Sequence, residues 1–386
     1  MKRNAVRELL KVATRPDVIS FAGGLPAAEL FPVDVVHEAA TAVLRRIGGR
    51  SLQYSETEGI PGLREWLARR YSHSQFQVRP ENVLITSGSQ QAIDLIGRVL
   101  LDEGNAVVVE NPTYLAALTA WRPFGAKFIP AESDGEGIRT DSLNDALAEK
   151  PKIAYLVPNF QNPRGTTLSL ERRHELVSLT RDNDAVVVED DPYRELRYEG
   201  QSLASLSELA GLLPAGPESH VVSLGTFSKT LAPGLRVGWV IAAAELIEKL
   251  AVTKQAADLH TSTFCQHLIL ELVTRGVLEE VVPLFRREYR RRRDAMLGAL
   301  EQYFPRDAIW TRPEGGMFLL ATLPKHLDGT ALLPAALKEN VAFVPGEEFH
   351  LNGRGRNTLR LNFSNASPER IEIGIERLAR VISMKC

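Results

Sequence analysis

Five polar side chains in this sequence follow short apolar runs, and their types suggest chemistry on a small molecule. Lys229 and Arg236 lie in GTFSKTLAPGLRVGW, directly after an apolar run. Asp190 and Tyr193 lie in VVVEDDPYREL, and Asn162 lies in PNFQNPRG, again where an apolar run ends. A lysine or a carboxylate at the end of a buried strand is costly unless an opposite charge or a ligand meets it. We therefore expect these residues to serve a ligand.

The elements that must position these residues alternate in type along the chain. Apolar runs without polar alternation are typical of strands in a parallel sheet that helices cover on both faces. The pattern predicts an α/β fold with three layers and a mostly parallel sheet. Ligands bind such sheets outside the carboxyl ends of the strands, so the polar residues should converge on one crevice. The predicted strands are 83–86, 106–110, 153–158, 185–190 and 220–225, with helices between them at Gln90–Leu101 and Leu170–Asn183.

The last third of the chain indicates a smaller α+β domain. A long helical pattern at 278–303 is followed by GGMFLLATL, NVAFVPG and TLRLNFS, which are typical of strands. Because 386 residues exceed what one small core needs, we predict more than one domain. The predicted division is an N-terminal segment (1–40) that packs with the small domain, a large domain (41–275) and a small C-terminal domain (276–386).

The composition gives no sign of a nucleic-acid or membrane partner. The 46 basic and 48 acidic residues leave a net charge of −2, and the apolar runs are too short to cross a membrane. Six arginines between Arg286 and Arg293 favour a solvated helix face over a nucleic-acid patch, because acidic residues flank them. Without a signal-peptide pattern at the N-terminus, we expect a cytoplasmic protein. Cys265 and Cys386 lack metal-site spacing, so we expect neither a disulfide nor a metal site.

The stretch LITSGSQQAIDL has the pattern of a phosphate-binding turn. A buried strand, a glycine turn and a helix follow one another, which leaves unpaired N–H groups at the positive end of a helix. Simple capping of the helix by Ser87 or Ser89 explains the same residues, and this alternative stays open. The patterns GxxxxGK[ST], GxGxxG and GxSxG are absent, which argues against a nucleotide-binding fold and a serine hydrolase.

A lysine amine, a carboxylate, a tyrosine and a phosphate site together suit pyridoxal 5'-phosphate (PLP). The PLP aldehyde forms a Schiff base with a lysine, and a carboxylate that keeps the ring nitrogen protonated makes the ring an electron acceptor. Lys229 would be the nucleophile and would also move the substrate proton. Asp190 would pair with the ring nitrogen, while Asn162 and Tyr193 would hydrogen-bond the ring oxygen.

The sequence resembles the fold-type I PLP-dependent aminotransferases of the class I/II group. It is especially similar to the 2-aminoadipate aminotransferase-like branch, which also includes aromatic and branched-chain aminotransferases. The matching motifs run from ISFAGGLPAAELFP to NTLRLNFS, nearly the whole chain, and SKTLAPGLRVGW and QNPRG are the most specific. The usual NPTG turn of that family is NPRG here, which makes Arg164 a local departure.

The resemblance implies roles for further residues. Arg360 would clamp the α-carboxylate of the substrate, a task that suits a planar guanidinium. Gly24 would lie in the loop beside that carboxylate, where a side chain would intrude. Tyr114 would stack on the ring, and Tyr54 would reach across a dimer interface to the phosphate of the neighbouring subunit. The residues implied for the phosphate in the same chain are Ser89, Gln90, Thr226, Ser228 and Arg236.

The activity that the resemblance implies is transfer of an amino group from an L-amino acid to a 2-oxo acid. The donor would be of the 2-aminoadipate, aromatic or branched-chain type, the acceptor would be 2-oxoglutarate, and the enzyme would be a homodimer with shared active sites. Arg7 is the candidate cation for an acidic substrate side chain, although an ordinary exposed helix arginine is the commoner interpretation. Other PLP chemistry (β-lyase, cyclase, decarboxylase or oxidase) stays open. A transcription-regulator module is disfavoured, because the sequence leaves no room for a DNA-binding domain.

Overall fold

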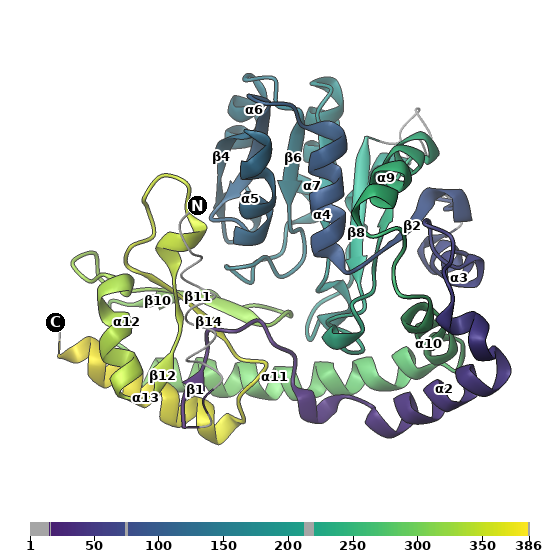
Figure 1. Ribbon diagram of the computed structural model, residues 1–386. Helices are drawn as coiled ribbons and strands as arrows, with labels where there is room; N and C mark the ends of the chain where they lie inside the picture. The colour runs from purple at the N-terminus through teal and green to yellow at the C-terminus, as the bar shows by residue number, and fades with distance from the viewer. Residues whose placement is uncertain (1–14, 16, 74–75, 212–219, 385–386) are drawn as a thin grey trace.

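An eight-stranded sheet forms the centre of the larger part of the molecule (Figure 1). The structure is a computed structural model that describes residues 15, 17–73, 76–211 and 220–384. The strand order is β2-β9-β8-β7-β6-β3-β4-β5, in which β8, β7, β6, β3 and β4 run parallel. The remaining pairs are antiparallel. The bounds are β2 Val83–Thr86, β3 Ala106–Asn111, β4 Lys127–Asp134, β5 Gly137–Ile138, β6 Ile153–Leu156, β7 Val186–Asp190, β8 Val221–Thr226 and β9 Gly238–Ile241.

Helices cover this sheet on both faces, because its strands are apolar on both faces. Successive residues of a strand point to opposite sides, so Val107 and Val109 of β3 face one helical layer and Val108 faces the other. The first layer contains α4 (Ser89–Leu100), α5 (Leu115–Trp121) and α9 (Ala244–Ala257). The second contains α6 (Thr140–Leu147), α7 (Leu170–Asp182) and α8 (Leu206–Gly211).

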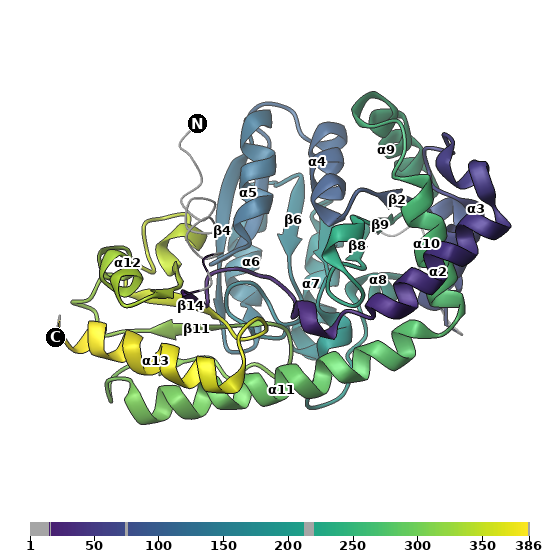
Figure 2. The same ribbon diagram turned by 60° about the horizontal axis from the view of Figure 1, so that its bottom comes forward.

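A second, smaller sheet lies beside the large one and contributes to the same cavity. Its order is β10-β11-β14-β13, with bounds Ile309–Trp310, Phe318–Thr322, Thr358–Asn362 and Val344–Pro345 in that order. The helices α12 (Gly329–Lys338) and α13 (Pro368–Ser383) lie with it (Figure 2). Near the N-terminus, β1 (Ile19–Ser20) pairs in parallel with β12 (Val341–Ala342). The N-terminal segment therefore joins the C-terminal part of the chain.

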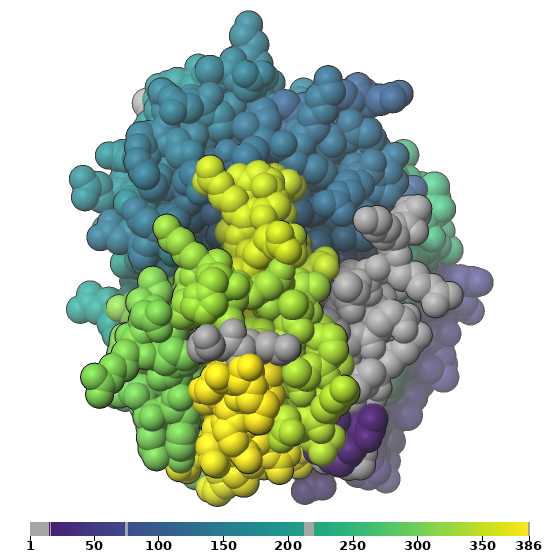
Figure 3. All heavy atoms as spheres, turned by 90° about the vertical axis from the view of Figure 1, so that its left-hand side faces the viewer, coloured from purple at the N-terminus to yellow at the C-terminus, as the bar shows by residue number. Residues whose placement is uncertain are grey.

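Two long-range connections tie the two parts together. The first is η7 (Gly346–Phe349) with the loop that follows it, which lies against the larger part of the molecule (Figure 3). The Phe349 carbonyl accepts from the N–H of Thr113, which follows β3, at 2.9 Å. The long helix α11 (Val277–Tyr303) runs beneath both parts (Figure 2). At its start lie α10 (Thr263–Thr274) and, packed on α10, α2 (Val33–Arg46) and α3 (Pro61–Tyr71).

The arginine run on α11 is not uniformly solvated, in contrast to the expectation from the sequence. The Arg292 and Arg293 side chains are buried. Arg292 pairs with Glu29 and Glu288, and Arg293 pairs with Glu199 at 2.7 Å. The reason is that α11 is covered by other elements on more than one side, so some positions of the run meet partners from distant segments.

The predicted fold class is confirmed, and each of the five predicted strands is present with ends that differ by up to two residues. The sequence analysis did not predict β4 and β9: β4 mixes proline with charged residues, and β9 begins inside the motif GTFSKTLAPGLRVGW. The division into domains stays a prediction. No helix within the described ranges combines the length and the apolar character needed to cross a membrane.

Candidate active site

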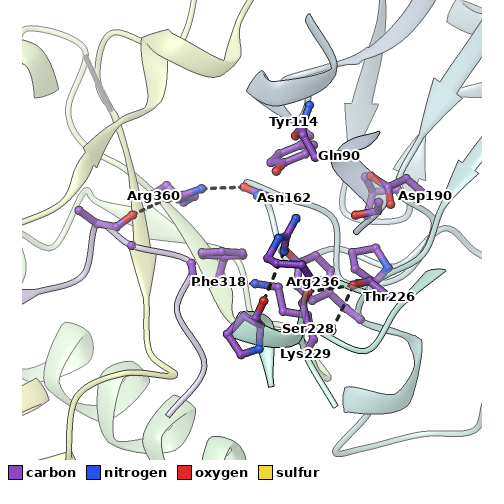
Figure 4. Close-up of a pocket in the computed structure, with 18 residues that line it drawn as sticks. Gln90, Tyr114, Asn162, Asp190, Thr226, Ser228, Lys229, Arg236, Phe318 and Arg360 are labelled. Atoms are coloured by element: carbon purple, nitrogen blue, oxygen red, sulfur yellow. Dashed lines mark hydrogen bonds between the residues drawn. The ribbon is translucent and has the colours of Figure 1, made fainter. Parts of the chain in front are cut away.

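A cavity of about 310 Å³ opens at the carboxyl ends of the strands of the large sheet, facing the small sheet (Figure 4). β7 ends at Asp190 and β8 ends at Thr226, while β14 of the small sheet supplies Arg360. Twelve residues singled out from the sequence line this one cavity. They are Gly24, Ser89, Gln90, Tyr114, Asn162, Asp190, Tyr193, Thr226, Ser228, Lys229, Arg236 and Arg360.

Lys229 lies in the cavity as an amine that gives up its proton readily. Its Nζ donates to the Gly24 carbonyl at 2.8 Å. Burial, together with the positive charges of Arg360 and Arg236, lowers the pKa of Lys229 to about 8. A neutral amine is the nucleophilic form, so the environment favours attack on a carbonyl carbon.

Asp190 is a buried carboxylate with one oxygen that lacks a partner. Its Oδ2 accepts from the Tyr155 hydroxyl at 2.7 Å, whereas Oδ1 has no hydrogen-bond partner within the described residues. Burial raises the pKa of Asp190 to about 6, although the bond from Tyr155 opposes this change. An unpaired buried carboxylate oxygen is costly, and a protonated ring nitrogen of a ligand would satisfy it.

The neighbouring Asp191, the second acid of VVVEDDPYREL, does not line the cavity. Its Oδ2 accepts from Asn159 Nδ2 at 2.7 Å, and the residue lines a different, much smaller pocket. The chain turns after β7, so the two carboxylates separate. The sequence could not distinguish the two acids, because their separation depends on the path of the chain after the strand.

One end of the cavity presents donors to an anion. The helix α4 starts at Ser89 after Gly88, which makes no side-chain cap. Gly88 has φ +83°, and a Cβ there would lie 2.3 Å from an Arg236 nitrogen, so the position requires glycine. Uncapped N–H groups at a helix start, with the Ser228 hydroxyl and the Arg236 guanidinium nearby, suit a phosphate. The alternative of a helix capped by Ser87 or Ser89 is therefore wrong.

The opposite end holds a buried arginine. Arg360 donates to Asn162 Oδ1 at 3.0 Å and to the Ala22 carbonyl at 2.5 Å, and its guanidinium lies over the rings of Phe318 and Phe349. Burial lowers the pKa of Arg360 to about 10. The described residues provide it with no acidic partner, and its Nε has no hydrogen-bond partner among them. The carboxylate of a bound ligand would provide Arg360 with the acidic partner that it lacks.

Comparison with known proteins decides the family. Residues 16–378 match the family model "Aminotransferase class I and II". The chain belongs to the class I and II aminotransferase family. It is 46% identical to a 2-aminoadipate transaminase of Thermus thermophilus, covering 99% of this chain and 94% of that protein. It is 44% identical to aromatic-amino-acid aminotransferase 1 of Thermococcus litoralis, covering 99% and 92%.

A solved structure extends this relationship to the fold and the cofactor. An α-aminoadipate aminotransferase of Thermus thermophilus, complexed with N-(5'-phosphopyridoxyl)-L-leucine, superposes with a TM-score of 0.92. It is 45% identical, with 99% of this chain and 95% of that chain covered. The chain is a PLP-dependent aminotransferase with the fold-type I architecture. The unpaired Asp190 oxygen, the uncapped start of α4 and the Lys229 amine fit the ring nitrogen, the phosphate and the aldehyde of PLP.

Tyr54, which was predicted from the sequence, does not line the cavity of this chain. Tyr54 is 77% exposed and contacts the His260 ring edge-on at 5.6 Å. This position leaves Tyr54 accessible to a second molecule. Arg7 lies outside the described residues, as does Cys386. Cys265 forms no disulfide, and no three His, Cys, Asp or Glu side chains within the described ranges gather as a metal site requires.

Sequence reasoning missed two aromatic residues of the site. The Tyr155 hydroxyl donates a hydrogen bond to Asp190 from inside the predicted strand 153–158. The presence of a hydroxyl within an apolar run was the one feature of the sequence that could have indicated this role. Phe318 stacks beneath Arg360 and contacts the Tyr193 ring edge-on at 6.0 Å. A Cβ on Gly24 would lie 3.0 Å from Phe318 Cζ, so this aromatic ring leaves no free room for a side chain at Gly24.

The departure at Arg164 leaves the turn around Asn162 in place. The Arg164 N–H donates to Gln161 Oε1 at 3.0 Å, and the Arg164 carbonyl accepts from the Thr311 hydroxyl at 2.6 Å. Both bonds use the backbone of Arg164, so any residue with an N–H can make them. The side chain is largely buried, which lowers the pKa of Arg164, and it does not line the cavity.

Proposed function

We propose that this aminotransferase transfers the amino group of an L-amino acid of the 2-aminoadipate, aromatic or branched-chain type to a 2-oxo acid, with 2-oxoglutarate as the acceptor. The observation that carries the proposal is the buried Arg360, which has no acidic partner in the described residues and lies across the cavity from Asp190. This arrangement suits a molecule with a carboxylate at one end, bound beside a ring with a protonated nitrogen.

The proposed roles follow from the contacts of each side chain. When bound, PLP supplies an aldehyde for a lysine amine and an electron-accepting ring that stabilises negative charge at the substrate Cα. Lys229 would hold the cofactor through its amine and would move the proton at the substrate Cα. Asp190 keeps the ring nitrogen protonated. Asn162 and Tyr193 hydrogen-bond the ring oxygen, and Tyr114 packs on the ring face.

We name the two ends of the cavity by their proposed ligands. The phosphate end consists of Ser89, Gln90, Thr226, Ser228 and Arg236. The carboxylate end consists of Gly24, Asn162 and Arg360. The Thr226 hydroxyl donates to Ser228 Oγ at 2.9 Å, which holds two hydroxyls of the phosphate end together. At the carboxylate end, Arg360 is buried and its guanidinium lies over the rings of Phe318 and Phe349.

The proposed donor range rests on the relatives and on the lining of the cavity. The relatives named above act on 2-aminoadipate and on aromatic amino acids. Among the described residues, the cations that line the cavity are Lys229, Arg236 and Arg360, and each already has a proposed role. An acidic substrate side chain would therefore need a further cation, and Arg7 remains the candidate. Apolar and aromatic donors need none, since Tyr114 and Phe318 line the cavity.

We further propose a homodimer in which Tyr54 of each subunit completes the phosphate end of the other. The support is the 77% exposure of an aromatic side chain that belongs to a motif of the site. We propose a cytoplasmic location, where free amino acids and 2-oxo acids meet, and a part in amino-acid biosynthesis. Small metabolites are the proposed partners, with neither nucleic acid nor a membrane surface involved.

The test is a panel of amino acids mixed with the PLP-loaded protein. Absorbance follows conversion of the cofactor to pyridoxamine phosphate with 2-aminoadipate, glutamate, phenylalanine, tyrosine and leucine. We expect conversion with 2-aminoadipate or with an aromatic or branched-chain donor, and one 2-oxoglutarate consumed per 2-oxo acid released. If product were released without consumption of 2-oxoglutarate, the reaction would be another PLP reaction and not transamination. Lys229→Ala is the matched control and should show neither the visible absorbance of the lysine-bound cofactor nor turnover.

A further inference from the structure

A buried lysine and its carboxylate partner lie behind the turn that forms the phosphate end. The Lys254 side chain, on α9, is 0% exposed. Its Nζ donates to Asp258 Oδ1, one turn further along, and this is the hydrogen bond that the structure records for it. A buried ammonium group is costly without such a partner. Lys254 therefore depends on Asp258, and nothing in the proposed chemistry uses the pair.

The other oxygen of Asp258 holds the turn from both sides. Asp258 Oδ2 accepts from the Ser87 hydroxyl at 2.8 Å and from Gln91 Nε2 at 2.7 Å. Gln91 Oε1 in turn accepts from the Ser87 N–H at 2.7 Å. Ser87 precedes Gly88 and Gln91 follows it, so one carboxylate oxygen joins the residues on the two sides of the glycine turn.

This bracing decides which N–H groups face the cavity. The N–H of Ser87 donates to the Gln91 side chain and is therefore not available to a ligand. By contrast, α4 begins at Ser89 without a side-chain cap. Arg236 Nη2 also donates to the Ser87 carbonyl at 3.2 Å. The turn is thus fixed through Ser87 and Gln91, and the first N–H groups of the helix stay available for an anion.

The charge of Asp258 would oppose a phosphate unless it were cancelled. Burial alone would raise the pKa of Asp258, but the hydrogen bonds from Lys254, Gln91 and Ser87 and the charge of Lys254 together lower it, which keeps the carboxylate ionised. A lone negative charge close to the turn would repel a phosphate dianion. Lys254 supplies one positive charge at contact distance, so the carboxylate can accept hydrogen bonds without adding net negative charge.

We propose that Lys254 and Asp258 position the phosphate-binding turn, Asp258 by accepting from Ser87 and Gln91 and Lys254 by cancelling the charge of Asp258. Both are positioning residues that act on the cofactor phosphate through the turn. The proposal rests on the proposed phosphate end and adds a supporting layer to it.

The test measures the affinity of the apoenzyme for PLP and for pyridoxal, which lacks the phosphate. Lys254→Met keeps the acceptors of Asp258 but leaves its charge uncancelled. The second variant, Lys254→Met with Asp258→Asn, removes the negative charge and keeps an acceptor oxygen. The third variant, Lys254→Met with Asp258→Ala, removes both the charge and the acceptor oxygens. We expect the dissociation constant for PLP to rise about tenfold in the first and third variants and to stay within about threefold of the wild type in the second. The dissociation constant for pyridoxal should be the same in all.

The control is Asp94→Asn, which breaks an ion pair with Arg98 on the same helix α4 at a solvent-exposed site. It should leave both affinities unchanged. Equal loss of PLP and pyridoxal binding in the variants would show a general structural defect and overturn the proposal. Wild-type PLP affinity in the Asp258→Ala double variant would also overturn it. Both double variants lack the buried charges, so they test the proposal even if Lys254→Met alone does not fold. Failure of the wild type to bind PLP would instead refute the proposed function.

Discussion

The two ends of the cavity use different groups to bind an anion. The phosphate end uses N–H groups at the start of α4, three hydroxyls and an exposed Arg236. The carboxylate end uses one buried Arg360, whose guanidinium lies over two phenylalanine rings and donates to Asn162 and to the Ala22 carbonyl. The first spreads its positive character over many groups on the large sheet, whereas the second concentrates it in one side chain of the small sheet.

The difference matches the anions that we assign to them. A cofactor phosphate stays bound through every turnover, so many partial charges and a braced turn can hold it. A substrate carboxylate arrives and leaves in every half-reaction. A single planar guanidinium in a buried site binds it strongly and directionally. The site tolerates the free state because a backbone oxygen and an amide oxygen hold the arginine in place.

The largest expected effect comes from Arg360→Lys. A lysine keeps the charge but loses the planar pair of donors, so we expect kcat/KM for every amino donor to fall by about 10²–10³-fold. The dissociation constant for PLP should change by less than about threefold, because the phosphate end is intact. Steady-state kinetics and apoenzyme titration measure the two quantities. A lysine variant that lost PLP affinity as strongly as kcat/KM would contradict the separation of the two ends.

A smaller and opposite pattern is expected for Arg236→Met. Loss of one charged donor from a set of several should raise the dissociation constant for PLP by about 10–100-fold. At saturating PLP, the KM for the amino donor should stay close to that of the wild type. Equilibrium dialysis of the cofactor and kinetics at high PLP test this outcome. A large rise in donor KM at saturating PLP would show that the ends are not separate.

The smallest effect concerns the pH at which Lys229 loses its proton. Burial, Arg360 and Arg236, in decreasing order, lower the pKa of Lys229 to about 8. The neutral amine reacts with aldehydes, so the rate at which pyridoxal reacts with the apoenzyme should rise with pH through about 8. Removing a nearby positive charge raises this pKa, so Arg360→Met should move the midpoint to higher pH, and Arg236→Met should do so by less. A reversed order, or midpoints at lower pH, would contradict the stronger influence of the carboxylate end.

Much of the fold could be predicted because its signals are local. The runs that became β3, β6, β7 and β8 are apolar on both faces, and each is followed by glycine, proline or acidic residues at the strand end. The motif around Lys229 likewise lies within one short stretch. By contrast, β4 mixes proline with charged residues and so lacks an apolar run, and the burial of Arg292 depends on Glu29, 263 residues away in the chain.

The sequence by itself determined the α/β class, the carboxyl-end positions of the polar residues and, through its motifs, the family and the cofactor. Only the tertiary structure decided that Asp190 and not Asp191 faces the cavity, that Tyr155 bonds to it, and that Lys254 and Asp258 brace the glycine turn. Strand and turn patterns depend on neighbours in the chain, so they can be read in sequence. Partners such as Asp258 and Ser87 are 171 residues apart, and only the order of the strands and the packing of the helices bring them into contact.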